Sequence, residues 1–485
     1  MRIPRAAVAG LALPALLLAA ACSSNPATGK KQLNLYSEQQ EVAMGRQYNQ
    51  QIEQQIGLYA DPELQRYVDR LGKSLAARSE RPNLPWTFAV VDDASINAFA
   101  LPGGFIYVTR GLMSHVSSEA ELAGVLGHEI GHVTGRHQVN QLSKQQLTQL
   151  GLTLGMILSP EARQYGDIAN LAGGLMFLKF GRDDERQADD LGLRYLSSTG
   201  YPPQAMSEVF GLLSRVSAAE GEGQGRLPSW LATHPNPEER QARMETHYAS
   251  LPDSAGSPEW RREAYLAQMD GVVYGPDPRQ GFFRSGVFYH PELRFRIEAP
   301  RGWKGINQRQ AVVWQPPQKD ALFVLTLAQG NDPRRTAQQF FNQQGVAAVG
   351  DLPRGIGATG AEFQAQTQQG VLQGAVGFLE HRGQVYQLLG FSQPNDWRQY
   401  GNDVARAMAS FERENDREIL EAQPMRVDVV TLDRAMSLAE FDRRHPSTVP
   451  LQKVALLNNL EPSTQLRAGD EVKRVVGGPR GGMEL

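Results

Sequence analysis

Three residues in the stretch GVLGHEIGHVTGRH, from Gly124 to His137, are of types that bind and use a metal ion. His128 and His132 are four residues apart, so on a helix both imidazoles lie on one face and reach one zinc ion at about 2.0–2.1 Å. Glu129 is the next residue after His128, and this offset places it beside water bound to the ion, as a general base requires. The spacing predicts a zinc-dependent hydrolytic site. The alternative is a helix whose histidines are merely solvated.

A catalytic zinc site needs a third protein ligand and an open fourth position. His137 follows His132 by five residues, roughly 140° around a helix, and is predicted to face away. An extended three-histidine motif fails because the required position holds Gln138. The better candidate is Glu185 in DDERQAD, with Asp189 one helical turn later. From spacing alone, Glu185 is either the third ligand, with Asp189 orienting a ligand histidine, or part of an exposed acidic face.

Small residues predict how the two helices meet. Gly124, Gly127 and Gly131 are poor helix formers, and three of them in one helix indicate close backbone packing. Ala188 and Gly192 are small enough to let the helix that carries Glu185 approach closely.

Helix and strand signals surround these segments. Ser37 and Asp61 are predicted to begin two helices, and Ser118 is predicted to cap the histidine-rich helix. WTFAVVD and GFIYVTRGL, joined through NAFALPGG, are typical of strands. Residues 141–180 are rich in Gln and then apolar in runs too short to span a membrane, so packed or membrane-grazing helices are expected.

Four motifs together resemble a known family. HEIGHVTGRH, followed by ERQAD, preceded by NAFALPGGFIYVTRGL and succeeded by THPNPEER, is similar to the zinc metallopeptidase family of HtpX and the CAAX prenyl endopeptidase. The nearest-looking branch is that of the periplasmic β-barrel assembly-enhancing protease. The resemblance implies a gluzincin fold and one Zn²⁺ per chain, with ligands His128, His132 and Glu185 and with Glu129 as base.

The same resemblance suggests roles for further residues. Asn97, Gly103 and Gly104 are expected beside an edge strand that holds extended substrate, and the alternative is a simple turn. His234 either donates to the oxyanion of the tetrahedral intermediate or closes over the zinc as an inhibitory fourth ligand. Arg240 would stabilise either the loop that carries His234 or the acidic Asp189.

The N-terminus predicts export. MRIPRAAVAGLALPALLLAAA begins with two arginines and then runs apolar, so residues 1–21 are predicted to be a signal peptide. Cys22, the only cysteine, resembles the acylated cysteine of bacterial lipoproteins, and Ser23 after it favours the outer membrane by analogy. The alternative is a conventional signal peptide. Residues 22–36 are polar and predicted to be a tether.

Composition shifts divide the rest into domains. The predicted fold is multidomain, with a mostly α gluzincin-type metallopeptidase domain and a small edge-strand sheet over residues 37–250, then a linker over 251–275. Residues 276–414 alternate strand-like and helix-like runs, which indicates an α+β sandwich that is weakly similar to PsbP. Residues 424–475 are similar to a degenerate βααβ LysM module, followed by a tail over 476–485.

The chain has 485 residues and a net charge of −3 with no basic block, which argues against nucleic acid as a partner. We expect a lipid-anchored periplasmic endopeptidase that degrades misfolded or stalled envelope proteins. One alternative is a largely latent chaperone or scaffold for outer-membrane assembly. Another is a peptidoglycan-associated hydrolase, suggested by the LysM-like unit.

Overall fold

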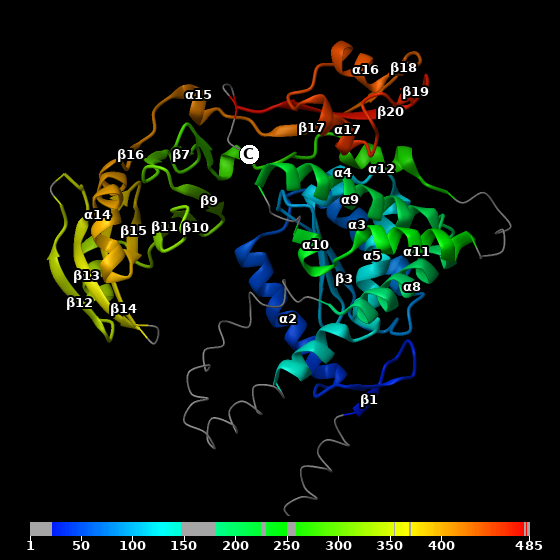
Figure 1. The fold of residues 1–485 in the computed structure, drawn as a ribbon, viewed down its shortest axis with the longest axis horizontal. Coiled ribbons are helices and arrows are strands. Elements are labelled where there is room, and N and C mark those ends of the chain that lie inside the picture. Colours follow the sequence, from blue (N-terminus) through cyan, green and yellow to red (C-terminus); the bar gives the residue numbers. More distant parts are fainter. Residues whose placement is uncertain are drawn as a thin grey trace, which may run out of the picture. The chain divides into compact units, whose positions relative to one another are not determined.

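The computed structural model describes most of the chain, namely residues 22–146, 180–224, 229–249, 259–353, 355–367, 370–479 and 482. The predicted signal peptide over residues 1–21, and most of the helices expected over 141–180, lie outside the described residues. The chain forms two compact units (Figure 1). The first joins the residues up to Tyr274 with Val427–Val475, and the second comprises Gly275–Arg426 with the C-terminal residues after Val475.

The first unit is mostly helical, as predicted. Ser37 and Asp61 cap the helices that they were predicted to begin, and Ser118 accepts a hydrogen bond from the backbone N–H of Glu121 at the start of α5. The helices are α2 (Glu38–Gln55), α3 (Pro62–Ala76), α4 (Arg110–His115), α5 (Glu119–Thr134), α8 (Arg182–Ser198), α9 (Gln204–Gln224), α10 (Ser229–Thr233), α11 (Pro237–Ala249) and α12 (Arg262–Met269).

A small sheet lies against the α5 helix. Its order is β3 (Thr87–Val91), β5 (Phe105–Thr109) and β4 (Ala98–Leu101), with β3 parallel and β4 antiparallel to β5. The stretch NAFALPGG thus does more than join two strands, because it contains β4, which pairs on one side only among the described strands. α3 packs on β3 and α5 packs on β4, so the sheet and the helices share one core.

Helices α5 and α8 approach as closely as the small residues predicted. A Cβ on Gly131 would lie 2.8 Å from the backbone oxygen of Ala188, and a Cβ on Gly192 would lie 2.8 Å from the backbone nitrogen of His128. Both distances are shorter than van der Waals contact, so glycine is required for this approach. All 16 residues of α5 are buried, which excludes a helix with solvated histidines.

The segment predicted to be a tether is folded. β1 (Cys22–Ser24) and β2 (Lys31–Leu33) form an antiparallel hairpin. The side-chain amide of Asn25 donates to the backbone oxygen of Gly135 at 3.1 Å, and Asn140 donates to the oxygen of Leu33 at 2.8 Å. The prediction that residues 22–36 are a tether is therefore wrong, because polar composition did not reveal these hydrogen bonds to residues that follow α5.

The C-terminal βααβ segment is part of the first unit. Its elements are β17 (Met425–Thr431), β18 (Met436–Ser437), α16 (Leu438–Arg444), α17 (Leu451–Leu457), β19 (Gln465–Leu466) and β20 (Glu471–Gly477). β17 pairs with β20. The Lys473 side chain of β20 is fully buried and donates to the backbone oxygens of Ser114, His115 and Val116 at the end of α4. The segment predicted as a LysM-like unit is thus held against the end of α4.

The second unit is mostly β. Its antiparallel seven-stranded sheet has the order β12-β13-β14-β15-β11-β10-β9, and a smaller sheet has the order β16-β8-β7-β6. The strands are β6 (Phe282–Arg284), β7 (Val287–His290), β8 (Phe295–Glu298), β9 (Lys304–Gln308), β10 (Ala311–Gln315), β11 (Ala321–Leu327), β12 (Val346–Asp351), β13 (Thr359–Thr367), β14 (Gly370–His381), β15 (Gln384–Ser392) and β16 (Glu412–Arg413).

Short helices complete this second unit. They are η3 (Pro278–Gln280), α13 (Pro333–Phe341), α14 (Pro394–Ala409) and α15 (Arg417–Leu420). α13 and α14 pack on the large sheet, where Trp314 and Phe323 are fully buried. The alternating burial along β11 follows from the two-residue period of a strand. The α+β character predicted for residues 276–414 is present, and its likeness to PsbP stays a prediction.

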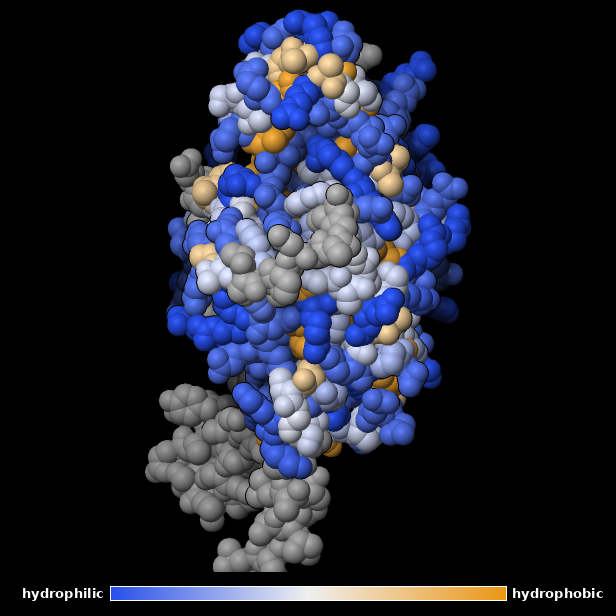
Figure 2. Space-filling view, turned by 90° about the vertical axis from the view of Figure 1, so that its right-hand side faces the viewer, coloured by the Kyte–Doolittle hydropathy of each residue, from blue (hydrophilic) through white to orange (hydrophobic). Residues whose placement is uncertain are grey.

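The face drawn in Figure 2 is mainly hydrophilic, with apolar residues in small, scattered patches. Scattered apolar residues of this kind are ordinary on a folded protein. None of the described helices has the length and apolar character needed to cross a membrane.

Candidate active site

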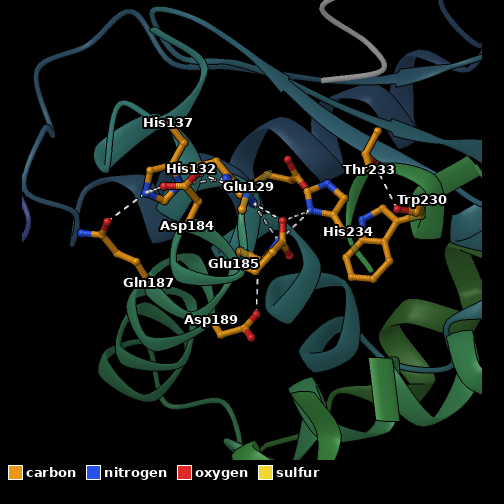
Figure 3. A network of polar contacts seen from close by, with 12 residues as sticks. Glu129, His132, His137, Asp184, Glu185, Gln187, Asp189, Trp230, Thr233 and His234 are labelled. Carbon is orange, nitrogen blue, oxygen red and sulfur yellow. Dashed lines mark hydrogen bonds and ion pairs between the residues drawn. The ribbon is translucent and has the colours of Figure 1, made fainter. Parts of the chain in front are cut away.

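Four side chains converge in the core of the first unit. His128 and His132 come from α5, Glu185 comes from α8, and His234 directly follows α10. One ligand atom from each lies within 4.8 Å of every other, and all four side chains are buried. Figure 3 shows Glu185 and His234 pointing toward each other beside His132. Burying four such polar groups together is costly unless they are paired or bind an ion.

The spacing of these atoms fits a zinc ion. Atoms that bind one tetrahedral zinc at about 2.0–2.1 Å lie about 3.3 Å from one another. The Nε2 atoms of His128 and His132 are 3.1 Å apart, and Nε2 of His132 lies 3.5 Å from Oε1 of Glu185. Nδ1 of His234 lies 3.3 Å from Nε2 of His128. Two or three imidazoles with one carboxylate form a donor set that suits zinc.

Asp189 and Arg240 lie directly behind the candidate ligands. Oδ1 of Asp189 is 3.0 Å from Nδ1 of His128, which leaves Nε2 of that ring facing the other donors. Arg240, from α11, contacts both Oδ atoms of Asp189 and lies 2.9 Å from Oε2 of Glu185. The guanidinium also lies over the ring of Trp230, 5.0 Å from its centroid. Arg240 therefore contacts both Glu185 and Asp189, the carboxylate beside His128.

The electrostatics keep the donors ready to bind a cation. Burial, with Arg240 nearby, lowers the pKa of His128 to about 3, so its ring is neutral. Burial alone would raise the pKa of Glu185, but His234 and Arg240 outweigh it and hold the pKa well below its ordinary value. Neutral imidazoles and an ionised carboxylate are the forms that bind metal.

Glu129 has a different environment from Glu185. It is 1% exposed, and burial raises the pKa of its carboxyl to about 7 although the neighbouring His132 opposes the rise. Oε1 of Glu129 lies 3.7 Å from Nε2 of His234. A carboxyl with a pKa near neutrality both accepts and returns a proton readily, as a general base and acid must.

The position of His137 contradicts the prediction made from helical spacing. α5 ends at Thr134, Arg136 adopts a left-handed φ of 58°, and a new helical stretch begins at His137. This reversal brings Nδ1 of His137 to 2.9 Å from Nδ1 of His132. The prediction that His137 faces away is wrong because it assumed one continuous helix. Gly135, which follows the last helical residue, was the sequence signal that could have revealed the turn.

The predicted substrate-binding residues lie around β4. Asn97, just before β4, is buried, and its Oδ1 has no hydrogen-bond partner among the described residues. Gly103 and Gly104 follow β4 with φ angles of 81° and 101°. A Cβ on Gly103 would lie 2.6 Å from the Cα of Val42, so close packing on α2 already explains this glycine. Cys22, the predicted lipidation site, is the first residue of β1.

Comparison with known proteins assigns a family to the part of the chain that contains this site. Residues 62–247 match the model of peptidase family M48. This part of the chain is an M48 peptidase domain. The β-barrel assembly-enhancing protease of Yersinia pestis is 37% identical over 210 residues, which cover 41% of this chain and 42% of that protein.

Other relatives match the M48 domain over a similar length. The mitochondrial metalloendopeptidase OMA1 of Arabidopsis thaliana is 34% identical and covers 37% of this chain and 35% of its own length. The metalloprotease YcaL of Escherichia coli K12 is 29% identical and covers 38% of this chain and 71% of its own length. The chain thus spans about two fifths of the length of the β-barrel assembly-enhancing protease of Yersinia pestis.

A comparison with solved structures gives a further, weak likeness. The solution structure of cyanobacterial PsbP from Synechocystis sp. PCC 6803 covers 26% of this chain and 91% of that protein, with 13% identity and a TM-score of 0.20. A TM-score this low carries no conclusion about the fold of this chain.

Proposed function

We propose that the protein is a zinc-dependent endopeptidase that hydrolyses peptide bonds of misfolded or stalled envelope proteins in the bacterial periplasm. The observation that carries this proposal is the convergence of His128, His132 and Glu185 next to Glu129 inside an M48 domain. One zinc ion per chain would be held by those three ligands.

Each residue around the metal-binding atoms has its own role in peptide hydrolysis under this proposal. Bound zinc supplies a Lewis acid that polarises the scissile carbonyl and lowers the pKa of water. Glu129 takes a proton from the attacking water and returns it to the departing amine. Asp189 holds the ring of His128, and Arg240 holds Asp189 together with Glu185. Extended substrate would pair with the edge of β4 that no other described strand occupies, next to Asn97.

His234 serves in this proposal as a fourth ligand that keeps the resting site closed. Its Nδ1 lies 2.8 Å from Oε1 of Glu185 and 3.3 Å from Nε2 of His128, among the other donor atoms. Its ring stacks on Trp230 with centroids 4.7 Å apart, which holds the loop inward. An oxyanion donor would instead need to stand apart from the ligand set.

Location and substrate follow from the N-terminus and the relatives. The apolar leader before Cys22 supports secretion and acylation, which would anchor the protein to the outer membrane. Relatives named as β-barrel assembly-enhancing proteases support unassembled envelope polypeptides as substrates. Contact with peptidoglycan through the LysM-like segment belongs to the same proposal.

Metal removal tests this function. Purified protein is incubated with an unfolded outer-membrane β-barrel polypeptide, and fragments are followed by gel and mass spectrometry. We expect a chelator to abolish cleavage and stoichiometric Zn²⁺ to restore it, because the water and carbonyl lose their activating cation. Cleavage that persists in metal-free protein would contradict the proposal. Cleavage of muropeptides in place of the polypeptide would identify a peptidoglycan hydrolase.

Replacing His234 tests the closed state. His234→Ala is expected to retain zinc and to raise kcat/KM roughly tenfold, as it would for a site that is closed in about nine molecules of ten. The matched control is His247→Ala, which removes a partly exposed histidine from α11. A 10²- to 10³-fold loss, of the order expected for a missing oxyanion donor, would instead assign His234 to catalysis.

A further inference from the structure

We propose that Gln187, oriented by Asn25 of the N-terminal hairpin, selects the tautomer of His132 that can bind the metal. The two residues and His137 form a chain of hydrogen bonds from the first strand of the structure to the zinc-binding group. This inference rests on the proposed zinc site, and it assigns positioning roles to Asn25, Gln187 and His137, which are not among the proposed ligands.

The chain starts from an amide whose orientation is fixed. Oδ1 of Asn25 accepts hydrogen bonds from the backbone N–H groups of Ala27 and Thr28, at 2.9 and 3.2 Å. Nδ2 of Asn25 donates to the backbone oxygen of Gly135 at 3.1 Å. Because a backbone N–H only donates and a carbonyl oxygen only accepts, the oxygen and nitrogen of this amide cannot be exchanged.

Asn25 then orients the amide of Gln187. Nε2 of Gln187 donates to Oδ1 of Asn25 at 3.3 Å, while Oε1 of Gln187 accepts from Nδ2 of Asn25 at 3.2 Å. The same Oε1 faces Nε2 of His137 at 2.9 Å, as Figure 3 shows. Gln187 therefore presents an acceptor to His137, not a donor.

The acceptor decides which ring nitrogen carries hydrogen. Nε2 of His137 must donate to Gln187, and Oδ1 of Asp184, at 3.9 Å, favours a proton on the same nitrogen. In the neutral ring Nδ1 is then an acceptor, so Nδ1 of His132 must donate to it across 2.9 Å. This leaves the lone pair on Nε2 of His132 directed at the other metal ligands. The opposite tautomer would place a hydrogen there and block the ion.

The position of Asn25 connects these hydrogen bonds to the proposed membrane anchor. Asn25 is 5% exposed and lies three residues after Cys22, the proposed acylation site. A hairpin tied to the membrane would thereby be tied to a zinc ligand. The anchor segment is in this respect part of the active-site support and not only a connection to the membrane.

Zinc affinity measured by chelator competition tests the proposal. Gln187→Leu should raise the Kd for Zn²⁺ about 10- to 100-fold, the range found when partners of metal ligands are removed. Gln187→Glu should keep the affinity within a few-fold of the native protein because a carboxylate is still an acceptor. The matched control is Gln241→Leu, which makes the same substitution at a glutamine of α11 that donates to Glu245 at 3.0 Å. Thermal unfolding of each metal-free variant checks that it folds.

A spectroscopic measurement keeps the proposal falsifiable even where a variant unfolds. In metal-free native protein with ¹⁵N-labelled histidine, we expect hydrogen on Nδ1 of His132 and on Nε2 of His137. The reverse tautomers, or an unchanged Kd in a folded Gln187→Leu variant that still cleaves polypeptide, would overturn this inference alone. A native protein that binds no zinc would overturn the proposed function together with it.

Discussion

Glu129→Gln is expected to lower the rate of peptide hydrolysis by about 10²- to 10⁴-fold, the usual contribution of a general base. The amide has nearly the same shape as the carboxylate but accepts no proton from water. Zinc binding should be unchanged because the donor set consists of His128, His132, Glu185 and His234. The two readouts are kcat on an unfolded β-barrel polypeptide and the Kd for Zn²⁺.

The same substitution at the surface provides the control. Glu238→Gln changes an exposed residue of α11 and should leave both readouts unaltered. If Glu129→Gln lost zinc as well, the substitution would have disturbed the fold of the site and not only its chemistry. A Glu129→Gln variant that rescued envelope defects as well as the native protein would favour the scaffold hypothesis over the endopeptidase.

Lys473→Met is expected to reduce the free energy of unfolding of the first unit on the order of 3 kcal/mol. The Nζ atom of this fully buried lysine donates to the oxygens of Ser114 and Val116 at 2.8 and 2.7 Å. These oxygens lie at the C-terminal end of α4, where helix carbonyls lack partners within the helix. Methionine fills a similar volume but leaves those acceptors unsatisfied.

Urea denaturation measures this effect, with Lys453→Met as the control. Lys453 is an exposed lysine of α17 in the same C-terminal segment, so its replacement should leave the midpoint unchanged. An unaltered midpoint for Lys473→Met would mean that the C-terminal segment does not support the peptidase fold. A lowered midpoint would indicate that this segment acts as a brace on the end of α4, whatever its glycan affinity.

Local rules predicted the secondary structure and most of the metal site. Ser118 begins α5 because its hydroxyl satisfies an otherwise unpaired N–H, and this needs only nearby residues. His128 and His132 share a face because of the helical period. Glu185 required the family resemblance as well, since spacing alone left it between a ligand and an exposed acidic residue. The structure buries it at 3% exposure.

The sequence by itself therefore determined the helix that carries His128 and His132 and the chemistry predicted for it, because both depend on contacts within a few turns of chain. Only the tertiary structure decided that His137 folds back onto His132, that Asn25 reaches Gln187, and that Lys473 is buried beneath α4. These contacts join residues from 5 to 359 positions apart. Hydrogen bonds between distant segments leave no periodic pattern in the sequence. A polar residue that bonds to a distant segment looks the same in the sequence as a polar residue that bonds to water.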